Sequence, residues 1–512
     1  MALAAQAFSY GTEILFVGTT AVPATGNVTL DLVGHGFIGS NGNATTVTIG
    51  GQSAKIVTAP HQSFAPSSDQ FPISAYDEMQ VLVPTGTAGT VDITVTSTAG
   101  TSTQRATLTY LPGVTDFPSA DKFTNIFYDS KRNQVYLSAG NKIDVFDAAL
   151  QKYVSPIVPP SVSASPLFQG LALTPNGSKL LATNFSDLSL EIINPDSPSS
   201  ATEVQLIPGA TPVGMGGSDV AATSTNQAMI ELAGQTGGAC SSFGEVYEVD
   251  LGTFAVTPLN LAAPACLLPN HARMSSTSSG DKVFLAVAEG GAYLWDAATN
   301  QWTSWQYVVN NNGTASGDGH WFASDYTSLD SQLIEHTQTQ IPEYFADFFL
   351  QGPQGAVPGE KMNASGSLLY QPLLHGVDVI DVNSGAWLRR IALTEQVQFV
   401  QNAMALDEAG DRLFLITDAG LTVLHMDSPP LSIGYLSPAN GPATGGTAVT
   451  IRGSGFQPGA TVTFGGTVAT TTFIDASTLQ VTTPPLPVGG VRVTVSNSVS
   501  STYSLDAAFQ AN

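Results

Sequence analysis

The stretch PATGNVTLDLVGHGF, Pro23–Phe37, returns near the other end of the chain as PATGGTAVTIRGSGF, Pro442–Phe456. The two copies then continue in step, with TTVTIGG from Thr45 and ATVTFGG from Ala460. Order, spacing and residue types agree over roughly 80 residues, the length of a small domain. The chain therefore carries two copies of one domain, one near each end.

Each copy has the residue pattern of a β-sandwich. Alternating apolar and polar residues, as in VTLDLV, predict half-buried strands with a period of two. The Gly-x-Gly-Phe element turns the chain and places one aromatic ring in the core, and Gly-Gly after VTI or VTF is typical of a hairpin. Short strands with turn signals at regular spacing predict two packed sheets.

The order of these motifs resembles the IPT/TIG immunoglobulin-like fold. The C-terminal copy is similar to it nearly throughout, including SPANGPATGGTAVTIRGSGF and VTFGG, whereas the N-terminal copy has an insertion at His61–Glu78. The resemblance implies spacers or adhesive modules on extracellular bacterial proteins. It supplies no catalytic residues.

Between the copies, a weaker repeat recurs about every 45 residues, the period of a four-stranded propeller blade. Each repeat has a strand, a turn, a second apolar strand and a third strand that ends in Asp or Asn. Counting the first strands predicts seven blades. We expect the terminal residues to close Asx-turns rather than to bind metal. They are Asp147, Asn194, Asp250, Asp296, Asp381 and Asp427.

The repeat, as in LTPNGSKLLAT from Leu173, resembles the YVTN/lactonase-like seven-bladed propellers. That resemblance implies the fold and an extracellular, surface-layer-like setting but no activity, because propellers serve as enzymes, scaffolds and receptors. The sequence thus predicts an all-β chain, a seven-bladed β-propeller flanked by two IPT/TIG sandwiches. We expect the domains to span residues 1–112, 113–430 and 431–512.

Composition excludes several classes of partner. With 16 basic and 40 acidic residues, the net charge of −24 repels phosphate backbones, which argues against nucleic acid. No apolar run is long enough to span a membrane.

The seven histidines lack metal-ligand spacing and no cofactor motif is present, so we expect no cofactor. The acidity leaves a divalent cation such as calcium open.

The two cysteines, Cys240 and Cys266, are predicted to form one disulfide in an oxidising compartment. Two buried free thiols are the alternative. Their spacing alone supports the disulfide.

Propellers usually bind ligands where the innermost strands begin. The predicted rim of the central channel carries one polar residue from each blade. These are Asn125, Gln169, Asp219, His271, His320, Lys361 and Asn402.

The densest cluster, SGDGHWFASDY, lies around His320. It permits a carbohydrate platform on Trp321 and Tyr326, or acid–base chemistry by His320 with Asp318. The alternative is that Trp321 belongs to the blade core and Gly-Asp-Gly is a turn. If the chain is an enzyme, the candidate catalytic residues are His320, Asp318, His271 and Lys361.

We expect a non-enzymatic bacterial protein, secreted or on the cell surface, that works in adhesion, binding or assembly. Its partners would be a protein or glycan at the cell surface, or further copies of itself in an oligomer, filament or surface layer. Two alternatives stay open. One is a secreted enzyme acting on polysaccharide or a lactone, and the other is a glycan-binding module without turnover that uses Trp302, Trp305 or Trp321.

Overall fold

The computed structural model describes most of the chain, and all of its regular elements are β-strands. The described residues contain no helix with the length and apolarity of a membrane span. They are residues 11–38, 45–64, 75–159, 165–207, 215–234, 245–259, 272–287, 291–306, 312–324, 326–338, 357–408, 410–426, 429–498 and 501–512.

The N-terminal sandwich has the strand order β1-β3-β6-β5-β4-β7-β8-β2. Its strands are β1 (Glu13–Val17), β2 (Ala21–Pro23), β3 (Thr29–His35), β4 (Thr46–Ile49), β5 (Gln52–Phe64), β6 (Ala75–Leu82), β7 (Gly89–Ser97) and β8 (Gly100–Leu111). The period-two pattern holds in β3, where Leu30 and Leu32 point into the core opposite Val81 and Met79 of β6.

The C-terminal sandwich repeats this topology strand for strand, with the order β37-β39-β42-β41-β40-β43-β44-β38. Its strands are β37 (Ser432–Ser437), β38 (Asn440–Gly441), β39 (Ala448–Ser454), β40 (Thr461–Phe464), β41 (Thr467–Asp475), β42 (Thr478–Thr482), β43 (Gly489–Ser498) and β44 (Ser501–Ala511). The repeat in the sequence is therefore a repeat of fold, and Phe456 of its Gly-x-Gly-Phe element lies in the core, as predicted.

Between the sandwiches the chain forms antiparallel groups of four strands. The first groups are β10 (Asn125–Asp129), β11 (Gln134–Ser138), β12 (Ile143–Asp147) and β13 (Lys152–Tyr153); β14 (Phe168–Leu173), β15 (Leu180–Asn184), β16 (Ser189–Ile193) and β17 (Ala201–Gln205); and β18 (Met215–Ala222), β19 (Gln227–Gly234), β20 (Glu245–Asp250) and β21 (Val256–Leu259). The next are β22 (Ala272–Ser276), β23 (Lys282–Val287), β24 (Gly291–Asp296) and β25 (Gln301–Gln306); β26 (Thr314–Ala315), β27 (Phe322–Ser324), β28 (Thr327–Leu329) and β29 (Glu335–Gln338); and β30 (Lys361–Met362), β31 (Leu368–Leu373), β32 (Gly376–Asp381) and β33 (Trp387–Ala392).

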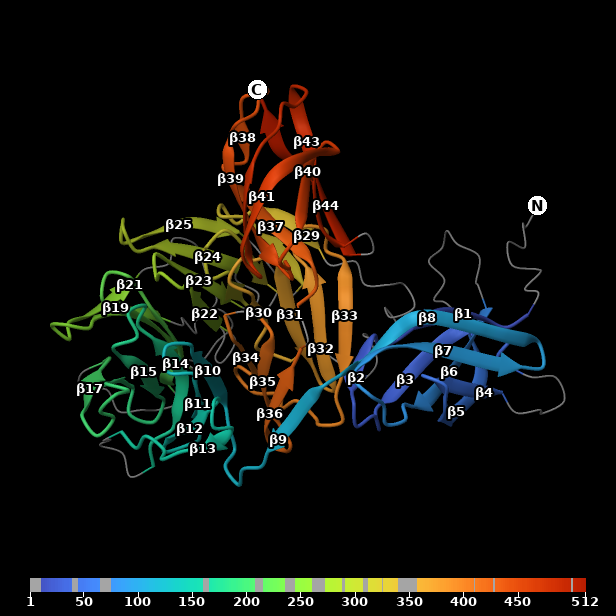
Figure 1. Ribbon diagram of the computed structural model, residues 1–512. Coiled ribbons are helices and arrows are strands. Elements are labelled where there is room, and N and C mark those ends of the chain that lie inside the picture. Colours follow the sequence, from blue (N-terminus) through green and yellow to red (C-terminus); the bar gives the residue numbers. More distant parts are fainter. Residues whose placement is uncertain are drawn as a thin grey trace.

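The last group takes its outer strand from far away in the sequence. Strands β34 (Met404–Leu406), β35 (Arg412–Thr417) and β36 (Gly420–His425) are completed by β9 (Gly113–Phe117), which pairs with β36. The innermost strands contact one another in the order β10, β14, β18, β22, β26, β30 and β34, and β34 contacts β10 again. The groups are thus the blades of a closed β-propeller (Figure 1).

The predicted Asx-turns are confirmed at the described blade ends. The Oδ1 atom of Asp147 accepts bonds from the amides of Ala149 and Leu150, and Asp250 does the same two and three residues ahead. Asn194, Asp296 and Asp381 each accept a similar amide. Asp427 lies outside the described residues.

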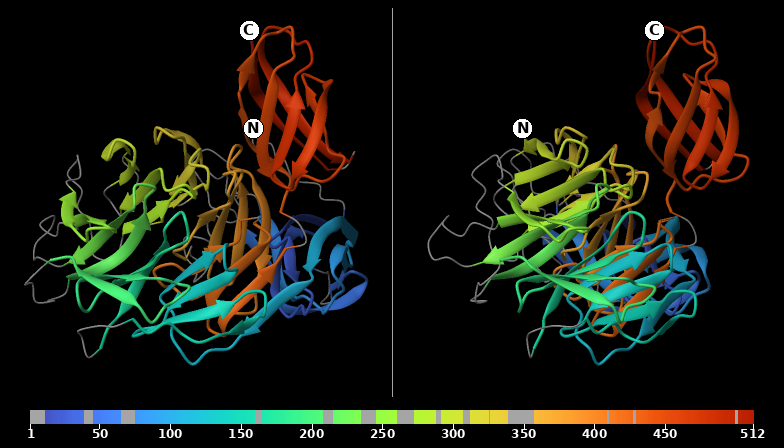
Figure 2. Two further views of the ribbon diagram at one scale, coloured as in Figure 1. Left: turned by 60° about the vertical axis from the view of Figure 1, so that its left-hand side comes forward. Right: turned by 90° about the vertical axis from the view of Figure 1, so that its left-hand side faces the viewer.

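The N-terminal sandwich joins the propeller through its backbone. Strand β2 lies between β8 of its own domain and β33 of a blade, so that one sheet runs through both (Figure 1). The Thr20 amide donates to the Arg390 carbonyl at 3.0 Å, and the Arg390 amide donates to Thr20 Oγ1 at 3.0 Å. The C-terminal sandwich instead projects from the propeller (Figure 2).

Asn402 holds the last blade to the first, which makes it a test of ring closure. Its Nδ2 donates to Asn125 Oδ1 at 3.1 Å and to the Ile126 carbonyl at 2.8 Å. We expect Asn402→Ala to lower the free energy of unfolding by about 1–3 kcal/mol, because buried acceptors lose their donor. Urea unfolding measures this, with the exposed Asn440→Ala as control. Equal stability of both variants would contradict the role of Asn402 in closure.

Candidate functional site

The ring of innermost strands encloses a cavity of about 340 Å³. Four of the predicted rim residues line it: Asn125, Asp219, Lys361 and Asn402. Gln169 lies beside it in β14, where its carbonyl accepts the Ser138 hydroxyl at 2.8 Å. The structure thus brings residues from four blades together at one cavity.

Asp219 connects two blades across the channel wall. Its Oδ2 accepts the Met274 amide of β22 at 2.8 Å, and its Oδ1 accepts the amide of Val220 at 3.0 Å. The backbone approach is close, because a Cβ on Gly170 would lie 2.8 Å from the Asp219 Cα. Burial raises the pKa of Asp219, and the charge of Arg273 and the two amide bonds oppose that shift.

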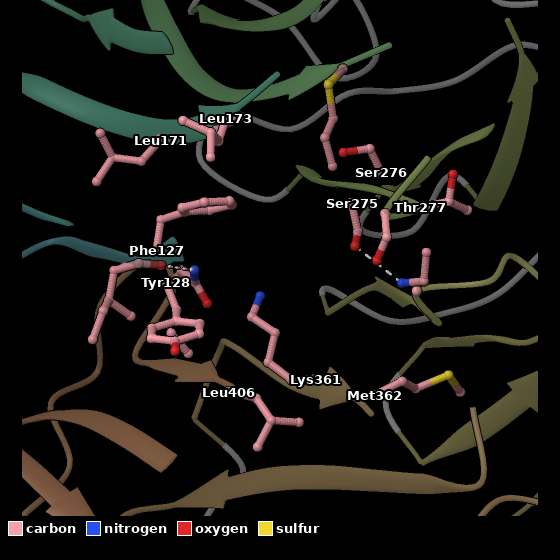
Figure 3. Close-up of a pocket in the computed structure, with 18 of the residues that line it drawn as sticks. Phe127, Tyr128, Leu171, Leu173, Ser275, Ser276, Thr277, Lys361, Met362 and Leu406 are labelled. Atoms are coloured by element: carbon pink, nitrogen blue, oxygen red, sulfur yellow. Dashed lines mark hydrogen bonds between the residues drawn. The ribbon is translucent and has the colours of Figure 1, made fainter. Parts of the chain in front are cut away.

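Lys361 and Arg273 are two cationic residues among those that line the cavity. Figure 3 shows the Lys361 side chain extending from β30 so that the ammonium group lies in the open centre. This ammonium group makes no hydrogen bond or ion pair with another residue in the described part of the chain, whereas the backbone of Lys361 pairs with Tyr370 in the sheet. Burial lowers the pKa of Lys361, while the charges of Asp219 and Glu360 oppose this and Arg273 adds to it.

Glu231 is a buried carboxyl group that the sequence analysis missed. It lies on β19 directly opposite Asp219, is 0% exposed, and neither oxygen has a hydrogen bond within the described residues. Burial raises the pKa of Glu231 to about 8, with the charge of Asp219 adding to the effect and Arg273 opposing it. The signal was present in the sequence, since AMIELAG places one acid inside an apolar strand.

Glu191 repeats this arrangement in the neighbouring blade. It lies in β16, within LSLEII, and is also 0% exposed without a hydrogen bond among the described residues. Burial raises its pKa to about 8, and the charges of Glu203 and Asp187 add to the effect. Both glutamates are therefore protonated over much of the neutral range.

The structure places His320 away from the cavity. The expectation that His320 begins an innermost strand is wrong, because that strand is Thr314–Ala315 and His320 lies in the turn after it. The strands of this blade are only two to four residues long, too short for alternation to fix their positions. The alternative of a Gly-Asp-Gly turn holds, and Trp321 packs in a core cluster.

His320 and Trp321 instead contact the C-terminal sandwich. The His320 ring stacks on Tyr435 with centroids 4.0 Å apart and an angle of 11° between the planes. Trp321 Nε1 donates to the Gly434 carbonyl at 3.3 Å. Asp318 Oδ1 accepts the His320 amide at 3.1 Å, and burial lowers the pKa of His320. The predicted acid–base pair therefore lies in a domain junction.

The same junction is fixed by two polar residues at the end of a strand in the following blade. The carboxylate of Asp381 accepts Ser432 Oγ at 2.5 Å and Tyr503 Oη at 2.9 Å. The Nδ2 of Asn383 donates to the carbonyls of Ile433 and Gly434 at 2.6 and 2.9 Å. An Asx-turn residue of the propeller thereby also holds a second domain.

A second cavity, of about 420 Å³, lies where the N-terminal sandwich meets the propeller. There Gln80 Nε2 donates to Asp31 Oδ1 at 2.8 Å, and burial raises the pKa of Asp31. Arg390 forms a two-pronged ion pair with Asp378, both contacts at 2.7 Å, and lies over the Trp387 ring at 4.3 Å. These groups strengthen the strand junction rather than forming a reactive cluster.

Some of the remaining candidate residues lie on outer strands of the blades, and the others lie outside the described residues. Trp302 packs against Trp295 in an edge-to-face arrangement with ring centroids 5.1 Å apart, and Trp305 is 47% exposed on β25. His271, Cys240 and Cys266 lie outside the described residues, so the disulfide stays a prediction. Within the residues described, no group of three His, Cys, Asp or Glu side chains is placed to hold a metal ion.

Comparison with known proteins identifies the family of the domain at each end. Residues 16–110 and 431–511 match the IPT/TIG domain, so the two sandwiches are IPT/TIG domains. Among curated proteins, none matches the chain significantly.

Many solved structures match, and two of them show how low the similarity is. Hydrazine synthase of Kuenenia stuttgartiensis has 12% identity and a TM-score of 0.46 over 61% of this chain and 98% of that chain. The Cps50 (Swd1) β-propeller domain of Myceliophteria thermophila has 11% identity and a TM-score of 0.45 over 61% and 99%.

Glu231 predicts a pH dependence of stability. In the folded chain the pKa of Glu231 is about 8, above the ordinary value of 4.5. The free energy of unfolding is therefore highest below pH 4.5, where Glu231 is neutral in both states. It falls as the pH rises from 4.5 through 8, because the unfolded chain ionises Glu231 more readily than the folded chain. We expect Glu231→Gln to stabilise the chain on the order of 3 kcal/mol at pH 8 and much less at pH 5. Denaturant unfolding at both pH values checks this, with the exposed Glu335→Gln as control. A gain that is independent of pH would contradict it.

The hydrogen bonds of Asn383 lead to a prediction about how firmly the C-terminal sandwich is attached to the propeller. Asn383→Ala removes the amide donor from the Ile433 and Gly434 carbonyls, of which Gly434 keeps the donor Trp321 Nε1, at a cost of about 1–3 kcal/mol, so we expect the sandwich to move relative to the propeller. Small-angle X-ray scattering should show a larger maximum dimension, and proteolysis between the domains should accelerate. Arg492→Ala, which removes an exposed ion pair with Asp506 on the same sandwich, is the control. An unchanged scattering curve would refute the role of Asn383.

Proposed function

We propose that the chain is a non-enzymatic extracellular protein of the bacterial cell surface, whose rigid three-domain body serves adhesion or assembly. We also propose that the ring is a seven-bladed propeller of the YVTN type. Two observations support this assignment. The innermost strands contact one another in sequence order around the ring, and Asx-turns follow the third strands of the blades. Its partners would be surface proteins or glycans, or further copies of the chain.

The observation that carries the proposal is the rigid attachment of both sandwiches. One sandwich shares a continuous sheet with a blade, and the other is held by hydrogen bonds from Asp381 and Asn383. Domains joined in this way keep fixed positions, which an ordered assembly requires. Accessory modules on enzymes need only a linker.

The positions of the candidate catalytic groups support the same conclusion. His320 and Asp318 lie at a domain junction, and the Asp219 carboxylate binds two backbone amides. Asp318 and Asp219 use carboxylate oxygens in these contacts, and His320 uses the face of its ring. Of the described catalytic candidates, Lys361 lines the cavity, whereas His320 and Asp318 do not.

The far end of the C-terminal sandwich offers a surface for contacts between molecules. Val468 and Val488 lie there, 68% and 77% exposed. Both lie at the end where Phe464 and Gly489 pair with their neighbouring strands, opposite the end that meets the propeller through Ser432. Exposed apolar side chains that lie together favour association.

The experiment is electron microscopy of the purified chain together with light scattering over a range of concentrations. We expect ordered particles larger than one chain, and we expect Val488→Asp to reduce their mass because it buries a charge in the contact. Val158→Asp, at a valine of the propeller that is 64% exposed, is the matched control. A strict monomer at every concentration would contradict assembly and leave adhesion to a separate partner.

A further inference from the structure

We propose that the central cavity binds a small hydroxylated carboxylate of the sugar-acid class, with Lys361 pairing with its carboxylate. This binding is separate from assembly through the sandwiches. It follows from the position of one charged side chain, the groups around it and the size of the space.

The first observation is a cation without a counter-ion contact. The Lys361 ammonium projects into the cavity (Figure 3), and no carboxylate of the described residues lies within ion-pair distance. An ammonium enclosed by protein is unfavourable unless a partner or water compensates it. A ligand carboxylate supplies a charge-assisted hydrogen bond at this place.

Charges of both signs act on Lys361, with the carboxylates of Asp219 and Glu360 beyond ion-pair distance and Arg273 as a neighbouring cation. Arg273 lines the same cavity and adds a second cation. Asp219 is turned toward the backbone amides of Met274 and Val220, and Glu231 lies behind it without exposure to the cavity. The net charge of −24 acts weakly here, since salt screens charges beyond about 8 Å while the two cations are local.

The other residues that line the cavity suit a ligand with hydroxyl groups and a carbon skeleton. Ser275, Ser276 and Ser278 line the cavity, and the Ser275 oxygen accepts the Ala315 amide at 3.1 Å. Leu171 and Leu406 offer apolar contact to the flat faces of a sugar (Figure 3).

The size of the space limits the ligand. About 340 Å³ is at the small end of the range for ligand pockets, which suits a single sugar unit rather than a chain.

The test is isothermal titration calorimetry with D-glucuronate, D-gluconate and the neutral D-glucose. We expect at least one of the two acids to bind and glucose to bind at least about tenfold more weakly, because glucose lacks the charged partner. Lys361→Met should weaken the acid by about tenfold or more. Lys152→Met, at an exposed lysine of β13, should leave its affinity unchanged.

A second measurement needs no variant and decides the matter if Lys361→Met fails to fold. Reductive methylation followed by mass spectrometry reports the reactivity of each lysine in the wild-type chain. We expect the acid that binds to slow methylation of Lys361 and not of Lys152, and glucose to slow neither. Absence of binding by both acids, equal binding of acid and glucose, or equal methylation of Lys361 with and without the acids would overturn the proposal. None of these results depends on whether the chain assembles.

Discussion

The pairing of β9 with β36 is the contact on which the rest of the structure depends. It brings Gly113–Phe117, which precede every blade in the sequence, beside Leu421–His425 at the end of the last blade. The ring closes only when these segments meet, so the two ends of the propeller stabilise each other. Because β8 ends two residues before β9 begins, the same pairing holds the N-terminal sandwich near β33 and allows β2 to join that blade.

Closure of the ring requires polar side chains between neighbouring blades, because apolar side chains cannot form hydrogen bonds with the backbone groups there. Neighbouring innermost strands splay apart and present unpaired backbone groups, and Asn402, Asp219 and Ser275 each bond such a group on the adjacent blade. Asp381 and Asn383 extend the same principle to the C-terminal sandwich. A residue that looks catalytic in a list of polar side chains can therefore be a structural link, and geometry separates the two roles.

The sequence was sufficient for the parts of the structure that local patterns determine. The repeated Gly-x-Gly-Phe motif predicted both sandwiches, and the Asp and Asn residues at blade ends predicted the Asx-turns. The closing strand β9 was not predicted, because its partner lies some 300 residues away and five residues carry little pattern. His320 was misplaced for a related reason, since a two-residue strand has no period to read.

The ionisable side chains inside the propeller are not explained by their contribution to the stability of the fold. Replacement of buried charged groups by apolar ones is often neutral or stabilising, so Glu231 opposes the stability of the ring when it is charged. Glu231 avoids most of that cost by staying protonated, since its pKa is about 8. Lys361 stays close to water in the cavity, where a charge can remain. An ammonium that is kept accessible in this way is suited to contact something that enters, which is why the cavity and not the stacked His320 is the place where ligand binding follows from the physics.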